Sequence, residues 1–518
     1  MDRSNESPSE RSITSAATAP TSAVTAPTPQ ATGPHSPGTA DFLQLDAADA
    51  PPGGLADWLT RELRRAVADG RLPVGSRLPA TRALATELRV SRGVVTEAYR
   101  RLTEDGRLAG RGRGGTVVVA APAGATAVPR PAPASAAPPS TAPAPALSAA
   151  TPDIWDVIRN APARIDLSPG RPDLTAFPRT AWLRAERAVL GDLPSAGLGY
   201  GDPRGTPELR RAVATWLALN RGISADPDEI LIVAGTAQAL DLTARVLRAD
   251  GISTMAMEDP GSLGVRQHLQ AGGLTTPPVP VDAEGLRVDA LRDLGAPAVL
   301  LTPAHQFPMG VVLAGGRRRE LLRWAADSGV LVFEDDYDAE HRYDRPPVPA
   351  LRPMLPERVL YAGSVSKLLA PALRVGWLLA PPKYRDALIE AKRFADLGNA
   401  TLPQLVLARL LESGALERHL RLVRGRHRRR RDAMVTAVRT QLPGATVHGA
   451  AAGLHVTITF DSTRPDTELA AAALERGVKT HPLSWHTQRP GAPGLLLGYA
   501  ATPTAAITEG IGLLGKAL

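Results

Sequence analysis

The sequence contains no cysteine among its 518 residues, which excludes disulfides, thiolate metal sites and a cysteine nucleophile. No run of 18 apolar residues is free of charge, so no transmembrane span is expected. The polar, acidic N-terminus lacks the basic end and the apolar stretch of a signal peptide. Together these absences favour a cytoplasmic location without membrane contact.

Lysine is scarce, and the positive charge is unevenly spread. Lys and Arg total 60 against 52 Asp and Glu, a formal net charge of +8, yet only five of the basic residues are lysines. Residues 53–120 alone hold 13 arginines and 7 acidic residues, a net +6. Most of the excess charge therefore lies in a small part of the chain, which favours a polyanionic partner such as DNA.

Composition divides the chain into four parts. Residues 1–50 are rich in Ser, Thr, Ala and Pro, and residues 121–152 hold nine prolines and a single charge. Such stretches bury too little apolar surface to offset the entropy of ordering. We therefore expect a disordered arm over 1–52, a DNA-binding domain over 53–120, a Pro/Ala-rich linker over 121–162 and an α/β domain over 163–518.

The basic part has the pattern of three helices and a hairpin. Apolar residues recur every four positions from Leu55 to Val67, so a first helix is expected to end at Gly70. Pro79 suits the first position of a second helix, and Ser91 is a good N-cap for a third. The tail LAGRGRGGTVVVA predicts a strand, a glycine-rich turn and a second strand. This order predicts a winged helix-turn-helix.

Polar residues near the starts of the second and third helices are predicted to face double-stranded DNA. The first turn of a recognition helix contacts base edges in the major groove, and free N–H groups at a helix start favour phosphate. Arginines on the hairpin can reach the backbone or the minor groove. The alternative is a solvated three-helix unit with ordinary surface arginines. The candidate DNA-binding residues are Arg77, Thr81, Arg82, Ser91, Arg92, Thr96, Arg111 and Arg113.

The large part alternates apolar strand patterns (EILIVA, APAVLLTP, GVLVFED, RVLYAG, GWLLAP) with helical stretches, which predicts an α/β domain with a largely parallel sheet. Ligands in such folds collect at the loops that follow the strands. Lys367 follows one strand, and a lysine there must be neutral or bonded. A neutral amine is a nucleophile that can form a Schiff base with an aldehyde. Ser364, Ser366 and Arg374 around it would suit a phosphate.

Three other strand ends carry unusual residues. Glu334–Asp338 is a run of four carboxylates and a phenol, where a protonated pyridine nitrogen would pair with one carboxylate and Tyr337 could bond a ring oxygen. A solvated loop or a Mg²⁺ site is the alternative, but a metal would not explain the Lys367 segment. The sequence Gly235-Thr236-Ala237 opens a helix whose N–H groups can hold phosphate, and His305 ends another strand.

The basic part resembles the GntR family over LPVGSRLPATRALATELRVSRGVVTEAYRRLTEDGRLAGRGRGGTVV, and the large part resembles a fold-type-I pyridoxal 5′-phosphate (PLP) aminotransferase. With its signatures EDDYDAEHRY, TPAHQFPMG and GSVSKLLAPALRVGW, the chain over roughly 55–518 is similar to the MocR family of transcriptional regulators. The resemblance implies a multidomain fold, in which a linker joins the winged helix to a class I aminotransferase fold with a smaller C-terminal α/β subdomain. It also implies PLP as cofactor and a head-to-tail homodimer, with each winged helix near the partner's PLP domain.

The resemblance assigns roles residue by residue. Lys367 would be the Schiff-base lysine, and Arg374 a phosphate or substrate contact. Asp335 would partner the pyridine nitrogen, with the adjacent Asp336 as the alternative. Tyr337 would contact the ring hydroxyl, and His305 would stand where aminotransferases usually keep an Asn. The phosphate cup would be lined by Gly235, Thr236 and Ala237 and completed by Ser364, and no metal is expected.

Two departures from the family pattern bear on function. Ser262 replaces the aromatic residue that usually stacks on the cofactor ring, and this loss would weaken cofactor binding or leave room for a different effector. Arg266 nearby could meet an acidic ligand. The segment 495–500 (LLLGYA) has no arginine where an aminotransferase often carries its substrate clamp. The second departure favours a regulator that senses PLP, or an amino compound reacting with it. The alternatives are an active aminotransferase with a DNA-binding appendage and a winged-helix protein that has lost PLP.

A second arginine cluster lies near the C-terminal end. The run RLVRGRHRRRRD (421–432) has six arginines within 424–431. It could be a second DNA contact, but a solvated helix of the PLP domain is the interpretation we favour.

Overall fold

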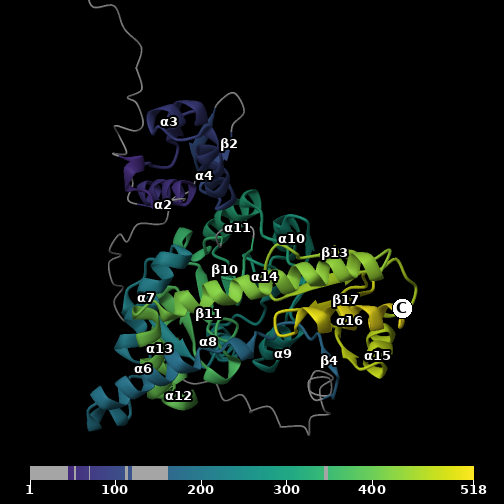
Figure 1. The fold of residues 1–518 in the computed structure, drawn as a ribbon. Coiled ribbons are helices and arrows are strands. Elements are labelled where there is room, and N and C mark those ends of the chain that lie inside the picture. Colours follow the sequence, from purple (N-terminus) through teal and green to yellow (C-terminus); the bar gives the residue numbers. More distant parts are fainter. Residues whose placement is uncertain (1–44, 52–53, 69–70, 111–114, 120–160, 344–347) are drawn as a thin grey trace, which may run out of the picture.

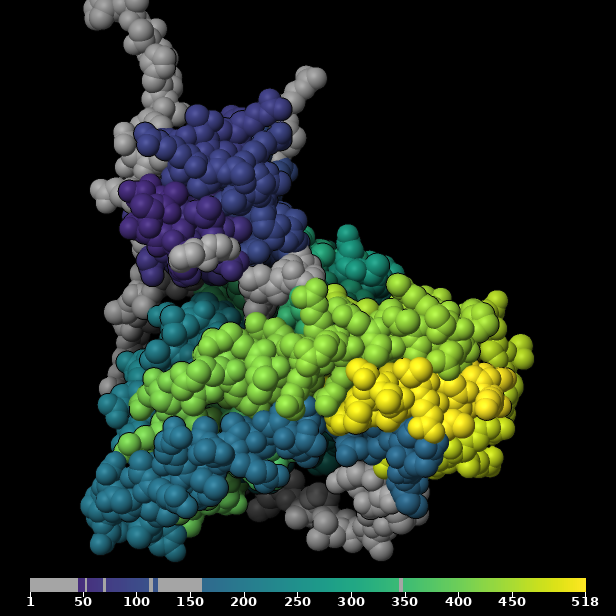
Figure 2. Space-filling model, viewed as in Figure 1, coloured from purple at the N-terminus to yellow at the C-terminus, as the bar shows by residue number. Residues whose placement is uncertain are grey.

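The computed structural model describes residues 45–51, 54–68, 71–110, 115–119, 161–343 and 348–518, which form a small N-terminal unit (the head, 45–119) and a large unit (the body, 161–518) (Figure 1). The head rests on the body above helix α11 (Gly315–Ser328), and Figure 2 shows the same arrangement in space-filling form. No helix in these ranges is long and apolar enough to cross a membrane.

The head is a winged helix. Helices α2 (Leu55–Ala68), α3 (Thr81–Glu87) and α4 (Arg92–Glu104) pack on a three-stranded sheet with the order β1 (Arg77–Leu78), β3 (Thr116–Val118), β2 (Leu108–Gly110). The predicted apolar faces of α2 and α4 are buried, with Leu55 half-buried at the start of α2. The last residues of the expected arm also pack here, where Ala47–Asp49 form a short 3-10 helix.

One local expectation for the head is wrong. Pro79 does not open α3, because Ala80 is the N-cap and the helix starts at Thr81. The Pro79 carbonyl instead accepts a hydrogen bond from the Tyr99 hydroxyl at 2.9 Å, which ties the chain before α3 to α4. Ser91 is the N-cap of α4, as predicted, and its hydroxyl accepts from Val94 N. Gly70, Arg111 and Arg113 lie outside the described residues.

The body is built on an eight-stranded sheet that contains all five predicted strands. Its central strands are parallel, but β12 runs antiparallel between β11 and β5, and β8 pairs antiparallel with β7. The order is β5 (Ile230–Val233), β12 (Gly376–Leu379), β11 (Val359–Ser364), β10 (Leu331–Asp336), β9 (Ala298–Leu301), β6 (Ala256–Asp259), β7 (Pro278–Asp282), β8 (Gly285–Leu286).

Helices cover both faces of this sheet and bury its apolar side chains. One core forms under α8 (Thr236–Ala249), α9 (Leu263–Ala271) and α12 (Pro382–Asp396). The cores on the opposite face form under α7 (Pro207–Arg221), α10 (Val288–Leu294), α11 and α13 (Thr401–Glu412). Helix α6 (Arg179–Asp192) packs against α13.

The C-terminal part of the body is the expected smaller α/β subdomain. The long helix α14 (Ala415–Gln441) leads into an antiparallel sheet with its own core. Strand β4 (Ile165–Asp166), from the start of the body, pairs with β15 (Val478–Lys479) beside this sheet. The sheet order is β13 (Thr446–His448), β14 (His455–Thr459), β17 (Gly494–Gly498), β16 (His481–Pro482), with helices α15 (Asp466–Glu475) and α16 (Thr504–Gly515).

Candidate functional site

The candidate site lies at the carboxyl ends of three neighbouring parallel strands. His305 follows β9, the acidic run ends β10, and Lys367 follows β11. Because these strands are adjacent and parallel, their ends meet at one edge of the sheet, as expected for a ligand site in this fold class.

Lys367 is the chemically distinctive residue of this edge. Its Nζ donates a hydrogen bond of 2.5 Å to the carbonyl oxygen of Gly170, in the loop that follows β4. Burial lowers the pKa of Lys367, against the opposing pull of Asp338 and Asp335. The amine is therefore held closer to its neutral, nucleophilic form than an exposed lysine would be.

The two adjacent aspartates of β10 have different surroundings. Asp336 Oδ2 accepts from Arg221 Nε at 2.6 Å and from the Tyr361 hydroxyl at 2.5 Å. Asp335 Oδ1 is buried without a hydrogen-bond partner, and burial, with Asp336 and Asp338 nearby, raises the pKa of Asp335 to about 7. Since side chains alternate along a strand, only one of the two can face the site, and Asp336 is already engaged on the other face.

A hydrogen-bonded group of three side chains stands beside Asp335. His305 Nδ1 lies 3.0 Å from the Tyr337 hydroxyl and 2.9 Å from Asp338 Oδ2. Asp338 therefore orients the imidazole, while His305 Nε2 is buried without a partner. Burial raises the pKa of Tyr337 well above its usual value, so its hydroxyl stays protonated and able to donate.

The residues predicted to line a phosphate cup stand at the start of α8 and near Arg374. Gly235 is its N-cap at a φ of +80°, no side chain caps the helix, and a Cβ on Gly235 would lie 3.3 Å from the Arg374 guanidinium. Arg374 donates to the Ala234 carbonyl at this point. The Ser364 hydroxyl, at the end of β11, donates a hydrogen bond of 2.9 Å to the Ser366 hydroxyl. An uncapped helix start beside a guanidinium is suited to a phosphate group.

The residues that depart from the family pattern have local partners. Ser262 caps α9, where its hydroxyl accepts from Val265 N. Arg266, the residue that we expected to meet an acidic ligand, donates a hydrogen bond of 3.0 Å from its guanidinium to the Trp485 carbonyl. After β17 stands the buried Tyr499, whose hydroxyl donates to the Gly453 carbonyl at 2.8 Å. Residues 495–500 therefore contribute a tyrosine hydroxyl, and no arginine that could bind a substrate carboxylate.

In the head, five of the predicted DNA-binding residues lie near the starts of α3 and α4, and Arg77 lies on β1. Arg92 Nε reaches the Thr81 hydroxyl at 3.4 Å, which brings the two helix starts together. Thr81 is half-buried, and the other described candidates are exposed, namely Arg77, Arg82, Ser91, Arg92 and Thr96.

The arginine run 421–432 lies within α14, and its inner side chains are engaged in the body. Arg426 and Arg430 both contact the buried carboxylate of Asp173, at 3.3 and 2.9 Å. Arg431 donates to the Ala450 carbonyl at 2.6 Å. The run is part of a body helix, as favoured above, but its inner side is packed and not solvated.

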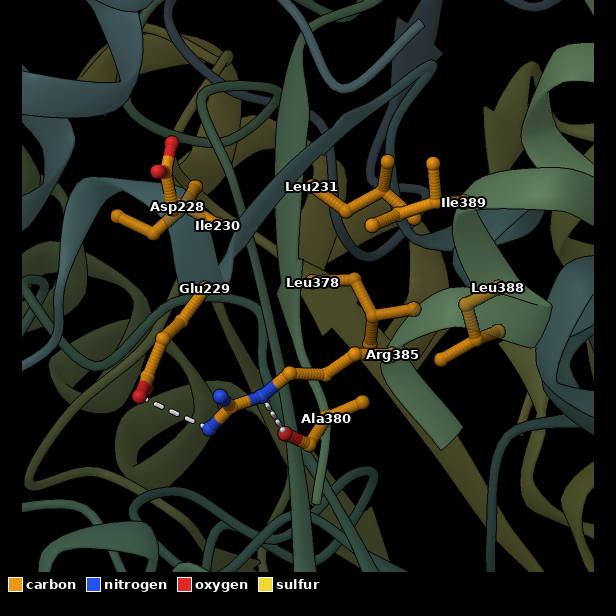
Figure 3. Close-up of a pocket in the computed structure, with 9 residues that line it drawn as sticks. All are labelled: Asp228, Glu229, Ile230, Leu231, Leu378, Ala380, Arg385, Leu388 and Ile389. Carbon is orange, nitrogen blue, oxygen red and sulfur yellow. Dashed lines mark hydrogen bonds and ion pairs between the residues drawn. The ribbon is translucent and has the colours of Figure 1, made fainter. Parts of the chain in front are cut away.

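The described residues offer no second ligand site, either as a metal cluster or at the small cavity in Figure 3. Within the described ranges no three His, Asp or Glu side chains could hold a metal ion. The cavity in Figure 3 lies between β5, β12 and α12 and holds about 10 Å³, and its lining includes the Arg385–Glu229 ion pair of 2.9 Å. That volume admits about one water molecule.

Sequence reasoning missed three contributors to the site. The Gly170 carbonyl and the Arg221 guanidinium come from segments 197 and 115 positions away from the residues they contact. No local pattern could identify them. Asp338 belongs to the acidic run that was singled out, but its role in orienting His305 needed the fold.

Comparison with known proteins supplies the family. The aminotransferase class I and II family model matches residues 164–508, and the model of the gntR family of bacterial regulatory proteins matches 55–118. The probable rhizopine catabolism regulatory protein MocR of Rhizobium meliloti is 31% identical over 89% of this chain and 92% of its own. The HTH-type pyridoxine biosynthesis transcriptional regulator PdxR of Corynebacterium glutamicum is 31% identical over 87% and 93%.

A solved structure extends the comparison to the body. The α-aminoadipate aminotransferase LysN of Thermus thermophilus, complexed with N-(5′-phosphopyridoxyl)-L-leucine, is 28% identical and covers 70% of this chain and 93% of its own, with a TM-score of 0.63. The match is to the body fold, and the ligand of that enzyme carries a phosphopyridoxyl group.

Proposed function

The chain belongs to the MocR family, in which a GntR-type head precedes an aminotransferase-like body, and from this premise we propose that it is a PLP-dependent transcriptional regulator. The single observation that carries the proposal is the presence, in one chain, of a winged helix and a body in which the half-buried Lys367 has a lowered pKa and the uncapped start of α8 lies against Arg374. The head binds an operator, and the body senses PLP or an amino compound that reacts with it.

The exposed polar residues of the head support the DNA-binding half. Arg92 and Thr96 on the first turns of α4 are the candidates for base contacts, whereas Arg77 and Arg82 are suited to phosphates. Because an operator is chromosomal, the working location proposed for the protein is the cytoplasm.

The residues at these strand ends fit PLP by two tests. The partnerless Asp335 Oδ1 supplies an acceptor for a protonated ring nitrogen, and Gly235 and Arg374 leave a cradle for the phosphate at the start of α8. Thr236 and Ala237 would offer their N–H groups there, and Ser364 its hydroxyl. When bound, PLP supplies an aldehyde that condenses with a primary amine.

The remaining site residues would position the cofactor and tune its chemistry. Lys367 presents an amine whose lowered pKa favours the neutral form. Tyr337 would donate to the ring hydroxyl, and Asp338 holds His305 next to Tyr337. Asp335 is assigned to the ring nitrogen in preference to Asp336, since Asp336 is held by Arg221 and Tyr361.

The division of the chain and its assembly complete the proposal. The four parts are the arm 1–52, the head domain 53–120, the linker 121–162 and the PLP-binding domain 163–518. We propose a homodimer as the working form.

Tyr499 stands where an aminotransferase would often carry its substrate-clamp arginine, which favours sensing over catalytic turnover. The rival function, an active aminotransferase, requires sustained amino-group transfer from an amino acid to a keto acid, which a coupled assay measures.

The cofactor assignment is tested by absorbance. Wild-type protein mixed with PLP should acquire a visible absorption band distinct from that of free PLP, and Lys367→Ala should abolish it. Lys383→Ala is the matched control, because Lys383 lies exposed on α12 and pairs with Asp250. A band that persists in Lys367→Ala would overturn the assignment.

The regulatory half is tested by footprinting the DNA upstream of the protein's own gene with and without PLP. We expect a protected region whose extent or affinity changes with PLP. Protection that is identical in both conditions contradicts PLP sensing, and an absence of protection at low salt contradicts DNA binding.

A further inference from the structure

Lys392, on helix α12, is the most deeply buried of the five lysines, with an exposed fraction of 0%. Its Nζ donates to Gln238 Oε1 at 2.8 Å, to Asp396 Oδ2 at 2.6 Å and to Asn399 Oδ1 at 2.6 Å. An ammonium group has three N–H donors, so each of them has a partner here. Because burying a charge without partners is costly in free energy, these three acceptors define what the lysine does in the fold.

The first acceptor, Gln238, lies on the first turn of α8, next to the residues proposed to hold phosphate. Its Oε1 also accepts from Ala234 N at 2.8 Å, and its Nε2 donates to Asp396 Oδ2 at 2.7 Å. Ala234 directly precedes Gly235, the N-cap of α8. Lys392 therefore holds, through one side chain, the backbone that enters this helix.

The second acceptor, Asn399, connects Lys392 to Arg374. Its Nδ2 donates to the Arg374 carbonyl at 2.9 Å, and the Arg374 guanidinium donates to the Ala234 carbonyl. These bonds close on themselves and form one network, which we call the Lys392 network. Its members are Lys392, Gln238, Ala234, Arg374 and Asn399.

The backbone is strained at two positions beside this network. The described ranges contain three non-glycine residues with a positive φ, and two of them lie here. Arg374, at a φ of +49°, belongs to the network, and Leu397, at +59°, ends α12 just before the turn that carries Asn399. Such a conformation persists in residues with a side chain only where the surroundings enforce it, as they often do at ligand sites. The hydrogen bond from Asn399 to the Arg374 carbonyl supplies part of that constraint.

The Lys392 network joins the two groups proposed to hold the phosphate. A Cβ on Gly235 would lie 3.3 Å from the Arg374 guanidinium, so the helix start and the guanidinium are close neighbours. The N–H groups of a helix start and a guanidinium bind one phosphate together only when their relative positions match its oxygens. Lys392 bonds to neither group directly, and it reaches both through side-chain amides.

We propose that Lys392 is a positioning residue for the phosphate of the cofactor, and that it sets the preference of the site for PLP over unphosphorylated pyridoxal. It acts on the start of α8 through Gln238 and on Arg374 through Asn399. This inference rests on the proposed function for its ligand, PLP. A network that served only the stability of the body would affect the binding of both aldehydes alike.

The test compares the affinities of the full-length protein for PLP and for pyridoxal, which carries the same aldehyde without the phosphate. Binding of each is followed by the visible band that it forms with the protein. Lys392→Met removes the ammonium group and keeps an unbranched side chain. We expect the affinity for PLP to fall by about 10-fold or more, as for a lost hydrogen bond to a charged group. The affinity for pyridoxal should change by less than about 2-fold.

A matched control and a second variant complete the design. Lys383→Met is the control, because Lys383 is exposed on the same helix and pairs with Asp250, and it should keep the wild-type ratio of the two affinities. Asn399→Ala removes the bond to Arg374 and leaves Lys392 with two acceptors. It should lower the affinity for PLP selectively, by a smaller factor, and it decides the question if Lys392→Met does not fold.

The outcomes separate this inference from the proposed function. A PLP-to-pyridoxal affinity ratio equal to that of wild type, in either folded variant, overturns the role of Lys392, whether both affinities are kept or both fall alike. In that case a wild-type protein that binds PLP leaves the proposed function intact. A wild-type protein that forms no visible band with PLP contradicts the proposed function, and this inference with it.

Discussion

In the head, the candidate DNA-binding residues Arg82 and Arg92 lie exposed near the starts of α3 and α4, whereas in the body Arg221, Arg318 and Arg352 are at most 2% exposed. The buried guanidiniums donate to backbone carbonyls or carboxylates, as Arg352 does to the Val359 carbonyl at 2.6 Å. The same residue type is therefore proposed to contact DNA in one region, whereas it forms internal hydrogen bonds in the other. Burial, and not arginine content, separates the two uses.

The head and the body also differ in their histidine content. All nine histidines within the described ranges belong to the body. Burial lowers the pKa of most of them, to about 4 for His341 and His455 and about 3 for His486. The body therefore holds neutral groups that acid would charge, while the described head contains none of this type.

The largest expected effect comes from removing a buried arginine. Arg221→Met leaves Asp336 as a buried carboxylate without its ion-pair partner, and we expect the free energy of unfolding to fall by about 3–5 kcal/mol. Urea unfolding followed by the PLP band reports on the body. The control is Arg82→Met, an exposed arginine of the head, which should change that unfolding by less than about 0.5 kcal/mol. Equal unfolding midpoints for the two variants would remove the contrast.

Much of the fold could be predicted because its signals are local. The four-residue spacing from Leu55 to Val67, the cap at Ser91 and the short apolar strand patterns each depend on neighbouring residues. The antiparallel direction of β12 was not predictable, since the pattern GWLLAP is the same in either direction.

The candidate site, too, could be predicted from the sequence only in part. Lys367, His305 and the acidic run stand out at strand ends, but the sequence alone leaves Asp335 and Asp336 as alternatives. Their difference depends on Arg221, which is 115 positions away in the chain. Long-range partners of this kind decide which face of a strand a carboxylate occupies, and they leave no local pattern.

An intermediate effect is expected from the pH dependence of the body. Burial lowers the pKa of His427 to about 2, and neither of its ring nitrogens has a hydrogen-bond partner. Because the folded pKa lies below the unfolded value of about 6.5, its stabilising contribution is present above that pH and is lost as the pH falls. His427→Phe should therefore reduce the loss of unfolding free energy between pH 7 and pH 5 by about 2 kcal/mol.

The measurement is urea unfolding of the body at both pH values, followed by tryptophan fluorescence, to which the head contributes only Trp58. His427→Phe should be compared with wild type at each pH, so that the raised pKa values of buried carboxyls such as Glu258, about 7, affect both proteins alike. An unchanged pH dependence would show that His427 does not resist protonation in the folded body.

The smallest expected effect on stability comes from a variant that changes DNA binding and leaves folding unchanged. Arg92→Ala should weaken binding by about 1–3 kcal/mol if Arg92 contacts a base, while the unfolding free energy of the body changes by less than about 0.5 kcal/mol. The matched control is Arg100→Ala on the same helix, because Arg100 is already paired with Glu97 at 2.5 Å and with Glu104. Affinity of Arg92→Ala equal to wild type at matched salt would exclude Arg92 from the DNA contact. Weakening of the same size in Arg100→Ala would instead indicate a general charge effect, because removing either arginine lowers the positive charge of α4 by the same amount.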